Sequence, residues 1–329
     1  MSTHHVGRID SCTSVSKIYE SWDRVQLAPT SLPGSGVRYQ KIMVTGGAGR
    51  LGKYVTDKLR QRCDLTVLDR IPVHGADLRF VDADVTDYEA LKRTFAGQDA
   101  VVHLAAIPNP RTAPADVTFR INVQGTWAVL QAAEDCGVKR VIVASSDAAL
   151  GIYYSTSRLG PQYLPVDEDH PLNPVEFYSL SKECTESICR SYANRGSVEV
   201  IVIRPTHIVF PPEYPELETR GADVQNYHMW TYVAPEDVAE GFRCALDARD
   251  GSYAACFITA ADGLNTRPTL EMLRERYGAL PPVRDAGYFE RNPTASILDG
   301  AHARDRLGFE AKVSWRDMVA LRDAPKATG

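Results

Sequence analysis

The feature that most constrains the fold of this chain is a glycine-rich loop between a short apolar run and an amphipathic segment. The run, Lys41–Thr45, has the β-branched character of a buried parallel strand. The loop repeats glycine at every third position, at Gly46, Gly49 and Gly52. A helix is predicted over 51–62, because apolar residues return to one face of it at Leu51, Val55 and Leu59. Strand, tight turn and helix in direct succession indicate a parallel α/β unit.

This order of elements suits the pyrophosphate of a dinucleotide. Glycines let the backbone approach the phosphates, and a helix N-terminus presents unpaired N–H groups and a partial positive charge. Asp69 ends the next predicted strand, 65–69, where its carboxylate can accept both ribose hydroxyls of an adenosine. A 2′-phosphate would be repelled there, so NAD is favoured over NADP. Arg50 and Arg70 weaken that preference, because either guanidinium could pair with a phosphate.

Strand and helix patterns alternate along the chain after residue 40. Further strands are predicted at 79–81, 100–104, 140–144 and 198–203, and helices at 88–95, 119–136 and 177–194. Such alternation favours right-handed βαβ units, and therefore an α/β fold with a doubly wound parallel sheet. Residues 1–38 are rich in Ser, Thr, Gly and Pro, which is typical of a flexible or loosely docked extension. An oligomerisation arm or a flap over the active site is the alternative for this extension.

Charge and composition exclude several classes of partner. Lys and Arg total 37 against 42 Asp and Glu, a net charge of −5, so no basic excess is available for nucleic acid. No apolar run approaches the ~18 residues that cross a bilayer, and the first 40 residues lack a signal-peptide core. We therefore expect a cytoplasmic protein without a membrane partner. The 7 cysteines include no Cys-x-x-Cys pair, which indicates reduced thiols and no metal site.

Several motifs in a fixed order resemble the short-chain dehydrogenase/reductase superfamily in its extended form, the NAD-dependent epimerase/dehydratase family. They are TGGAGRLG at 45–52, Asp82-Ala83-Asp84-Val85, His103-Leu104-Ala105-Ala106, Asn122-Val-x-Gly-Thr126, Ser145-Ser146 and Tyr178-Ser-Leu-Ser-Lys182. The resemblance covers about residues 40–320. It implies a Rossmann sheet with a small C-terminal substrate lobe, in one domain over 39–329. Residues 39–204 would mainly bind NAD, residues 205–298 would mainly form the interleaved substrate lobe, and 299–315 resembles the family's closing segment.

The resemblance also assigns cofactor contacts. They are Gly46, Gly49, Arg50, Leu51, Gly52, Asp69, Asp84, Val85, Leu104, Ala105, Ala106, Asn122, Tyr178 and Lys182. In the family the residue at Asp84 contacts the adenine, and the segment 104–106 lines the cofactor. Asn122 is expected to brace a helix against the active-site backbone, with a direct catalytic role as the alternative. The family often pairs through the helices around 119–136 and 177–194, which implies a homodimer.

Tyr178, Lys182 and Ser146 are the predicted catalytic residues. Oxidation of an alcohol needs a base for the hydroxyl proton, and a phenol with a pKa of ~10 is a poor base at neutral pH. Tyr178 and Lys182 lie one turn apart on one helical face, so the ammonium can stabilise the phenolate and also bind the nicotinamide ribose. Ser146, five residues before Gly151, would hold the substrate oxygen.

The resemblance and the residues that depart from it lead us to expect a small sugar or sugar-like substrate. Nucleotide-sugar members of the family usually carry Asn and Arg where this chain has His207 and Trp230, and those lost donors suit a diphosphate. The segments around 144–161 and 230–237 resemble the uronate dehydrogenase branch. That branch has Asn-His after its Ser-Ser, whereas an anionic Asp147 here would repel a carboxylate. The substrate contacts predicted are Ser146, Asp147, Tyr154, Arg204, His207 and Trp230.

The leading hypothesis is thus an NAD-dependent oxidoreductase acting on the hydroxyl or carbonyl of a small sugar. The first alternative is a nucleotide-sugar epimerase or dehydratase, which keeps NAD tightly bound and regenerates it in each turnover. The second is an NAD-sensing regulator without catalysis, which the complete set of Ser146, Tyr178 and Lys182 argues against.

Overall fold

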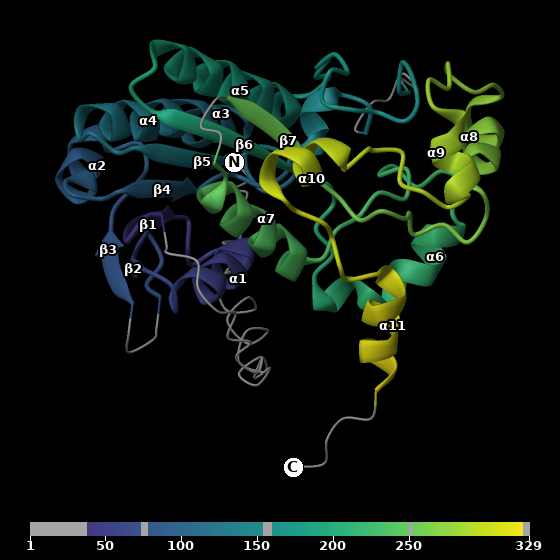
Figure 1. The fold of residues 1–329 in the computed structure, drawn as a ribbon, viewed down its shortest axis with the longest axis horizontal. Helices are drawn as coiled ribbons and strands as arrows, with labels where there is room; N and C mark the ends of the chain where they lie inside the picture. The colour runs from purple at the N-terminus through teal and green to yellow at the C-terminus, as the bar shows by residue number, and fades with distance from the viewer. Residues whose placement is uncertain (1–37, 74–77, 154–159, 250–252, 325–329) are drawn as a thin grey trace, which may run out of the picture. The chain divides into compact units, whose positions relative to one another are not determined.

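The structure, a computed structural model, describes residues 38–73, 78–153, 160–249 and 253–324 (Figure 1). The predicted extension 1–38, apart from Arg38, and the predicted substrate contact Tyr154 lie outside these ranges. The predicted α/β fold is confirmed: the described residues form a seven-stranded parallel sheet in the order β3-β2-β1-β4-β5-β6-β7. The strands are β1 (Lys41–Thr45), β2 (Asp64–Asp69), β3 (Arg79–Asp82), β4 (Ala100–His103), β5 (Arg140–Ala144), β6 (Glu199–Pro205) and β7 (Ala254–Ile258).

Helices connect the strands and extend beyond the sheet. They are α1 (Arg50–Leu59), α2 (Tyr88–Phe95), α3 (Ala115–Phe119), α4 (Gly125–Asp135), α5 (Phe177–Arg195), α6 (Leu217–Ala222), α7 (Pro235–Asp247), α8 (Thr269–Tyr277), α9 (Ala286–Arg291), α10 (Ala301–Leu307) and α11 (Trp315–Asp323). A π-helical turn η2 (Arg120–Gln124) joins α3 to α4, and short 3₁₀ turns form η3 (Asp147–Leu150) and η4 (Pro211–Glu216). The helix predicted over 119–136 therefore contains a π turn at its start.

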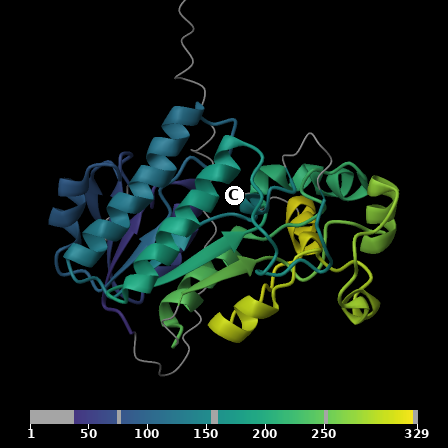
Figure 2. The ribbon, with the colours of Figure 1, turned by 90° about the horizontal axis from the view of Figure 1, so that it is seen from above.

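Alternating side chains of the central strands face two helical layers. Ile42 and Val44 of β1 point into a core shared with α1 and α7, whereas Met43 points into a core shared with α2, α4 and α5. Figure 2 shows α4 and α5 lying side by side over one face of the sheet, and α7 belongs to the opposite face. Both faces of a parallel sheet are thereby covered, as its β-branched strands require.

A third apolar core lies beyond the sheet and carries the remaining helices. It is built from segments far apart in the chain, including Leu150, Leu164, Val209, Trp230, Leu273 and Trp315. The segments interleave with the sheet domain, because Leu150, Ile152, Tyr153, Leu164 and Val166 belong to this core together with residues after 205. A role of this part in binding substrate stays a prediction.

The parallel strands bring their carboxyl ends to one edge of the sheet. Strand order reverses between β1 and β4, because the chain leaves β1 toward β2 and β3 and returns to β4 on the other side. Ligands of doubly wound sheets bind in the crevice at such a switch point. Thr45, Asp69, His103 and Ala144 end their strands at this edge.

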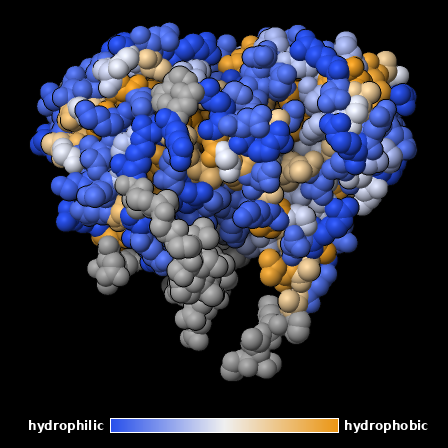
Figure 3. Space-filling view, viewed as in Figure 1, coloured by the Kyte–Doolittle hydropathy of each residue, from blue (hydrophilic) through white to orange (hydrophobic). Residues whose placement is uncertain are grey.

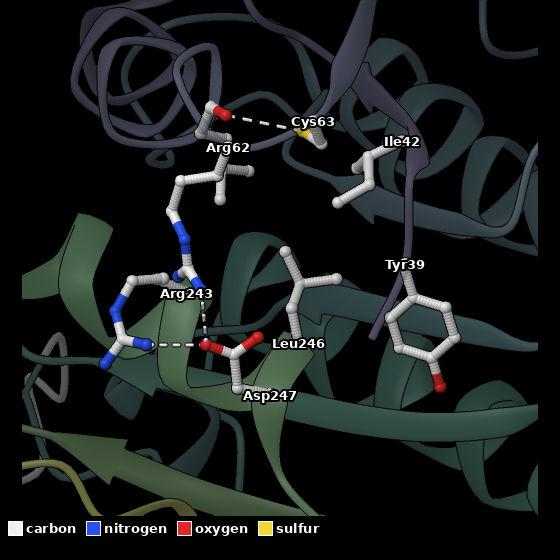
Figure 4. A pocket seen from close by; sticks show the side chains of 8 residues that line it. Tyr39, Ile42, Arg62, Cys63, Arg243, Leu246 and Asp247 are labelled. Carbon is white, nitrogen blue, oxygen red and sulfur yellow. Dashed lines mark hydrogen bonds and ion pairs between the residues drawn. The ribbon is translucent and has the colours of Figure 1, made fainter. Parts of the chain in front are cut away.

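A small hollow lies at the other end of the sheet (Figure 4). Ile42 from the start of β1 lines it with Tyr39 and Leu246, and Arg62 and Arg243 both turn toward Asp247 at its rim. Its volume of about 10 Å³ is at the lower limit for one water molecule, so it is no substrate site.

The surface carries few large apolar side chains. On the face shown in Figure 3, hydrophilic residues surround small hydrophobic patches. Among the described residues Trp127 of α4 and Leu180 of α5 are 44% and 41% exposed. No helix in the described part of the chain combines the length and apolarity that a membrane span needs.

Candidate functional site

The glycine loop closes tightly on the strands and on helix α1. Gly46 has a φ of 75°, in the left-handed region, and a Cβ there would lie 2.5 Å from the backbone nitrogen of Ala105. A Cβ on Gly52 would lie 2.3 Å from the carbonyl oxygen of Gly46. Gly49, exposed at the N-cap of α1, has more space. Only glycine permits this approach of backbone to backbone, and the resulting cradle at a helix N-terminus fits a dinucleotide pyrophosphate.

Two carboxylates stand beside the cradle. One oxygen of Asp69 accepts a hydrogen bond from Ala48 N at 3.0 Å, and the other accepts from Arg70 N and Ile71 N. These bonds fix the half-exposed Asp69 where a ribose hydroxyl would arrive. Burial raises the pKa of the Asp84 carboxyl, but two hydrogen bonds from Thr86 and the charges of Arg70 and Arg120 together outweigh it and lower that pKa. An adenosine contact at either residue stays a prediction.

Arg50 connects the cradle with the third core. It is the first residue of α1, and its guanidinium lies 4.0 Å from the ring centroid of Phe210 and 3.3 Å from Glu213. Glu213 in turn accepts hydrogen bonds from His207 and from Arg220. Burial opposes the ionisation of Glu213, but these two partners outweigh it and lower its pKa to about 2. One carboxylate therefore joins the N-terminus of α1 to His207.

The other predicted cofactor residues surround the same edge of the sheet. Leu51 is half-buried in the first turn of α1, Val85 packs against Gly125, and Leu104, Ala105 and Ala106 follow β4. Asn122, in the π turn, donates to Ile107 O and Ser181 Oγ, and its Oδ1 accepts from Ile107 N. Asn122 thus braces the helix against the loop after β4, which is the structural role expected for it.

The three predicted catalytic residues come from two elements that pack together. Ser146 is the N-cap of η3, directly beyond the end of β5, and α5 carries both Tyr178 and Lys182. The helix α5 packs against η3. The ammonium of Lys182 lies 5.9 Å from the ring centroid of Tyr178. Tyr178 and Lys182 are 5% and 3% exposed, so little solvent reaches either side chain.

Burial controls the charge of Lys182. Its Nζ donates a hydrogen bond to Ala144 O at 2.8 Å, at the end of β5. Desolvation lowers the pKa of Lys182 to about 8, although the negative charge of Glu186 raises it. A lysine with this pKa keeps its proton at neutral pH and yields it more readily than an exposed one.

Glu186 is a buried residue of the site that the motifs did not identify. It accepts hydrogen bonds from Ser145 Oγ at 2.6 Å and from the guanidinium of Arg204 at 2.9 and 2.7 Å. Glu186 follows Lys182 by four residues, so the helical period alone could have placed it behind the lysine. A second buried group, His103, bridges Thr45 and Thr126, and burial lowers its pKa to about 3.

Two of the predicted substrate contacts, Arg204 and Trp230, are buried in this structure, and a substrate role for either stays a prediction. Arg204 is 3% exposed, and Glu186 binds its guanidinium at two nitrogens, so the charge is already neutralised inside the protein. Trp230 is completely buried in the third core, and its indole N–H donates to Asp223 O. A side chain that no water-sized probe reaches cannot form a pocket wall in this conformation.

Asp147 and His207 are two other predicted substrate contacts. Asp147 lies beside Ser146, and His207 binds the same carboxylate as Arg50. The Ser146 hydroxyl accepts from Ala148 N and donates to Asp147 at 3.1 Å. Burial raises the pKa of Asp147 to about 7, against the hydrogen bond from Ser146, so Asp147 is less anionic at neutral pH than expected. His207 is one-fifth exposed and bonded to Glu213.

Comparisons with known proteins match most of the chain. The model of the NAD dependent epimerase/dehydratase family matches residues 42–254. An L-arabinose 1-dehydrogenase (NAD(P)(+)) from Haloferax volcanii is 30% identical over 79% of this chain and 99% of its own length. A uronate dehydrogenase from Pseudomonas syringae pv. tomato is 31% identical over 67% of this chain and 74% of its own.

Solved structures share the fold. A short-chain dehydrogenase/reductase superfamily protein from Agrobacterium tumefaciens with bound NAD superposes with a TM-score of 0.65 at 25% identity, over 85% of this chain and 95% of that one. A uronate dehydrogenase from the same organism has a TM-score of 0.62 at 21% identity, over 88% and 91% of the two chains.

Proposed function

Because this chain belongs to the NAD-dependent epimerase/dehydratase family, we propose that it is an NAD-dependent dehydrogenase that oxidises a hydroxyl group of a small free sugar. Family membership confirms the resemblance drawn from the motifs and NAD as the cofactor. The residues that would hold NAD are the glycine cradle, Asp69 and Lys182, whose placement fits a dinucleotide across the switch point of the sheet.

The environment of Lys182 is the observation that carries this proposal. The ammonium is buried, held by Ala144 O and placed beside the ring of Tyr178. A positive charge beside a phenol favours its ionised form, so Tyr178 is suited to take the proton of a substrate hydroxyl. Ser146 would orient the same substrate oxygen and donate a hydrogen bond as negative charge develops on it. NAD, when bound, supplies the acceptor for the hydride that leaves the substrate carbon.

The partner of the Ser146 hydroxyl sets a condition on this mechanism. That hydroxyl donates to Asp147 in the structure, and a hydroxyl has one proton to donate. Substrate binding must therefore redirect the Ser146 proton from Asp147 to the substrate oxygen. The partly protonated Asp147 loses little when this occurs, because burial already disfavours its charge.

Steady-state assays with free sugars test the proposal. Purified protein is incubated with NAD and with L-arabinose, D-galactose, D-glucose, D-galacturonate or glucose 6-phosphate, and reduced cofactor is followed by absorbance. We expect Tyr178→Phe to lower kcat by ~10²–10⁴-fold with unchanged NAD affinity. Tyr88→Phe is the matched control, because Tyr88 lies on α2 and its hydroxyl contacts Asp135 on the helix layer. Full turnover by Tyr178→Phe would refute the mechanism.

The nucleotide-sugar alternative predicts a different product. UDP-glucose would then be converted to an isomer without net formation of reduced cofactor. The donors that suit a diphosphate are replaced here by His207, bonded to Glu213, and by the buried Trp230. Isomerisation of a nucleotide sugar together with inactivity toward every free sugar would decide for the epimerase.

A homodimer that pairs through α4 and α5 is part of the proposal. Trp127 and Leu180 expose apolar surface on these two neighbouring helices, and such patches mark interfaces. Light scattering after gel filtration should give a dimer for the native chain and a monomer for Trp127→Glu. Leu321→Glu on α11, where Leu321 is 66% exposed, is the control and should stay dimeric.

We also place the protein in the cytoplasm. The cysteines of the described residues are free thiols, which fits a reducing compartment. Fractionation of the source cells would test this location.

A further inference from the structure

Glu186 of α5 is a buried carboxylate that the proposed mechanism does not use. It is 0% exposed and accepts three hydrogen bonds, one from the hydroxyl of Ser145 at 2.6 Å and two from the guanidinium of Arg204 at 2.9 and 2.7 Å. Taking charges out of water is costly even when they are paired, and an apolar pair of similar size is often as stable. Stability alone therefore does not account for an ion pair at this place.

Glu186 and Lys182 hold the same strand end from one helix. They are four residues apart, so their side chains leave one face of α5 one turn from each other. Lys182 Nζ donates to Ala144 O at 2.8 Å, and Glu186 binds the side chain of the next residue, Ser145. Ser146 follows directly. Two successive residues at the end of β5 are thus tied to α5 just before the predicted catalytic serine.

Arg204 fixes the carboxylate from the neighbouring strand. It lies in β6, which pairs with β5, and Ser145 N donates to Ile203 O beyond the last paired residue of β5. The guanidinium is 3% exposed and meets both oxygens of Glu186, one through Nε and the other through Nη2. A guanidinium that binds both carboxylate oxygens sets the orientation of the carboxylate and compensates its charge. Glu186 therefore has one fixed position beside the end of β5.

Glu186 supplies the negative charge among the titratable groups around Lys182 and its neighbours. These groups are Tyr178, Glu186 and Cys189 of α5, His103 of β4, Arg204 of β6 and Tyr253 just before β7. Burial lowers the pKa of His103 to about 3 and raises the pKa of the Cys189 thiol, so both side chains are uncharged at neutral pH. Burial also raises the pKa of Tyr253 to about 12. Within this set the ammonium of Lys182 has one anion, Glu186.

This anion opposes the effect of burial on the lysine. Desolvation lowers the pKa of Lys182 to about 8, and attraction by the charge of Glu186 limits the fall. Removal of a nearby opposite charge changes a pKa by ~1–3. Without the charge of Glu186 the lysine would therefore be largely neutral at physiological pH. A neutral amine would no longer favour the phenolate of Tyr178.

We propose that Glu186, fixed by Arg204 and Ser145, is a positioning residue of the active site: it supplies the counter-charge that keeps Lys182 an ammonium, and it ties the end of β5 to α5. This role rests on the proposed dehydrogenase function. Its first consequence, the charge of Lys182, is measurable without substrate or cofactor. Glu186 is enclosed and acts through Lys182 and through the residue before Ser146.

An NMR titration of the cofactor-free full chain tests the counter-charge. Lysine labelled with ¹³C at the ε carbon is incorporated, and the chemical shift of that carbon follows the charge of the amine from weakly acid to strongly alkaline pH. The signal that is missing in Lys182→Arg belongs to Lys182. The chains compared are the wild type, Glu186→Gln, Arg204→Lys and the double variant Glu186→Gln/Arg204→Met. Glu183→Gln is the matched control, because it makes the same change three residues away on α5, where the charge of Glu183 acts on Cys184.

The variants should separate the charge of Glu186 from the geometry of its ion pair. In Glu186→Gln, which keeps the shape of the side chain, the pKa of Lys182 should fall from about 8 to below ~7. It should also fall in the double variant, which removes the unpaired guanidinium as well and keeps the test available if the single variant does not fold. Arg204→Lys retains both charges and loses the two-point geometry, so Lys182 should titrate near its wild-type pKa there, and likewise in Glu183→Gln.

The pH profile of turnover gives a second measurement. Because the ammonium is lost at lower pH in Glu186→Gln, the alkaline limb of the kcat/KM profile should move to lower pH. With the free sugar that the wild type oxidises best, kcat/KM at pH 8 should fall by ~10-fold, and the loss should be smaller at weakly acid pH. A structural role alone would lower kcat/KM by the same factor at every pH.

Two results would overturn the proposal. One is a Lys182 that titrates at the same pH in the wild type and in both variants that lack the charge of Glu186. The other is an Arg204→Lys variant that lowers the pKa of Lys182 as much as Glu186→Gln does, because geometry and not charge would then control the lysine. A wild type that oxidises no free sugar would instead refute the proposed dehydrogenase, and the titration would still decide whether Glu186 is the counter-charge.

Discussion

The carboxyl of Asp147 should make the stability of this protein fall as the pH rises from weakly acid to weakly alkaline. Asp147 is 5% exposed, and burial raises its pKa from 3.8 to about 7. Between these two values the folded chain holds a proton that the unfolded chain has released. Stability from this group is therefore complete below pH 3.8 and is lost as the pH rises through about 7.

The magnitude follows from the size of the pKa shift. Each pKa unit corresponds to about 1.4 kcal/mol, so a shift of roughly three units gives ~4 kcal/mol over the full window. Asp147→Asn keeps an oxygen for the Ser146 hydroxyl and removes the titration. Relative to the wild type, the variant should therefore gain about that free energy of unfolding between pH 4 and pH 8.

Urea denaturation followed by tryptophan fluorescence at several pH values measures this difference. Every other titrating group is shared by both proteins, so subtraction isolates Asp147. Asp57→Asn on the exposed face of α1, where the Asp57 side chain is 63% exposed, should show a nearly constant difference from the wild type. If the free energy of unfolding of Asp147→Asn also differed from the wild type by the same amount at every pH, Asp147 would not carry a raised pKa in the folded chain.

Three further substitutions test the cradle and the buried ion pair. Asp69→Ala should raise KM for NAD by ~10–100-fold and narrow the preference for NAD over NADP, measured as kcat/KM with both cofactors. Gly46→Ala should cost ~1–3 kcal/mol in urea denaturation and abolish NAD binding, because its Cβ would meet Ala105 N at a positive φ. Arg204→Met should cost ~3–5 kcal/mol by leaving Glu186 unpaired and buried, yet leave KM for sugar nearly unchanged. A large rise of that KM with intact stability would instead support the predicted substrate contact at Arg204.

Local sequence patterns predicted most strands of the sheet, because these strands are short runs of apolar, mostly β-branched residues. The runs at β5 and β6 are dominated by Val and Ile, and β1 combines Ile, Met and Val directly before the glycine loop. Strand β7, with the sequence AACFI, was missed, since its alanines and cysteine have little strand preference of their own. Pairing with β6 and cover by α7 and α10 make it a strand, and neither is visible in a single sequence.

The candidate site likewise has a part that the sequence alone indicates and a part that depends on tertiary contacts. Ser146, Tyr178 and Lys182 lie on short motifs with a fixed spacing, so the sequence alone singles them out as candidates, and their catalytic roles stay predictions. Lys182 is bound by Ala144 O at the end of β5, and the stacking of His228 on His207 joins segments that the third core brings together; neither contact is visible in the sequence. The sequence did not show that Arg204 is paired with Glu186 or that Trp230 is enclosed, because a residue type does not tell which tertiary neighbours surround it.

The position of Glu213 matters for any attempt to alter what this protein accepts. It contacts both Arg50, at the start of α1 beside the glycine cradle, and His207, so the predicted cofactor and substrate regions share one carboxylate. A substitution at His207 removes one of the side chains that fix Glu213, and it should therefore also disturb the contact between Glu213 and Arg50. Libraries aimed at new sugars should for this reason vary Arg50 and His207 together and screen at more than one NAD concentration.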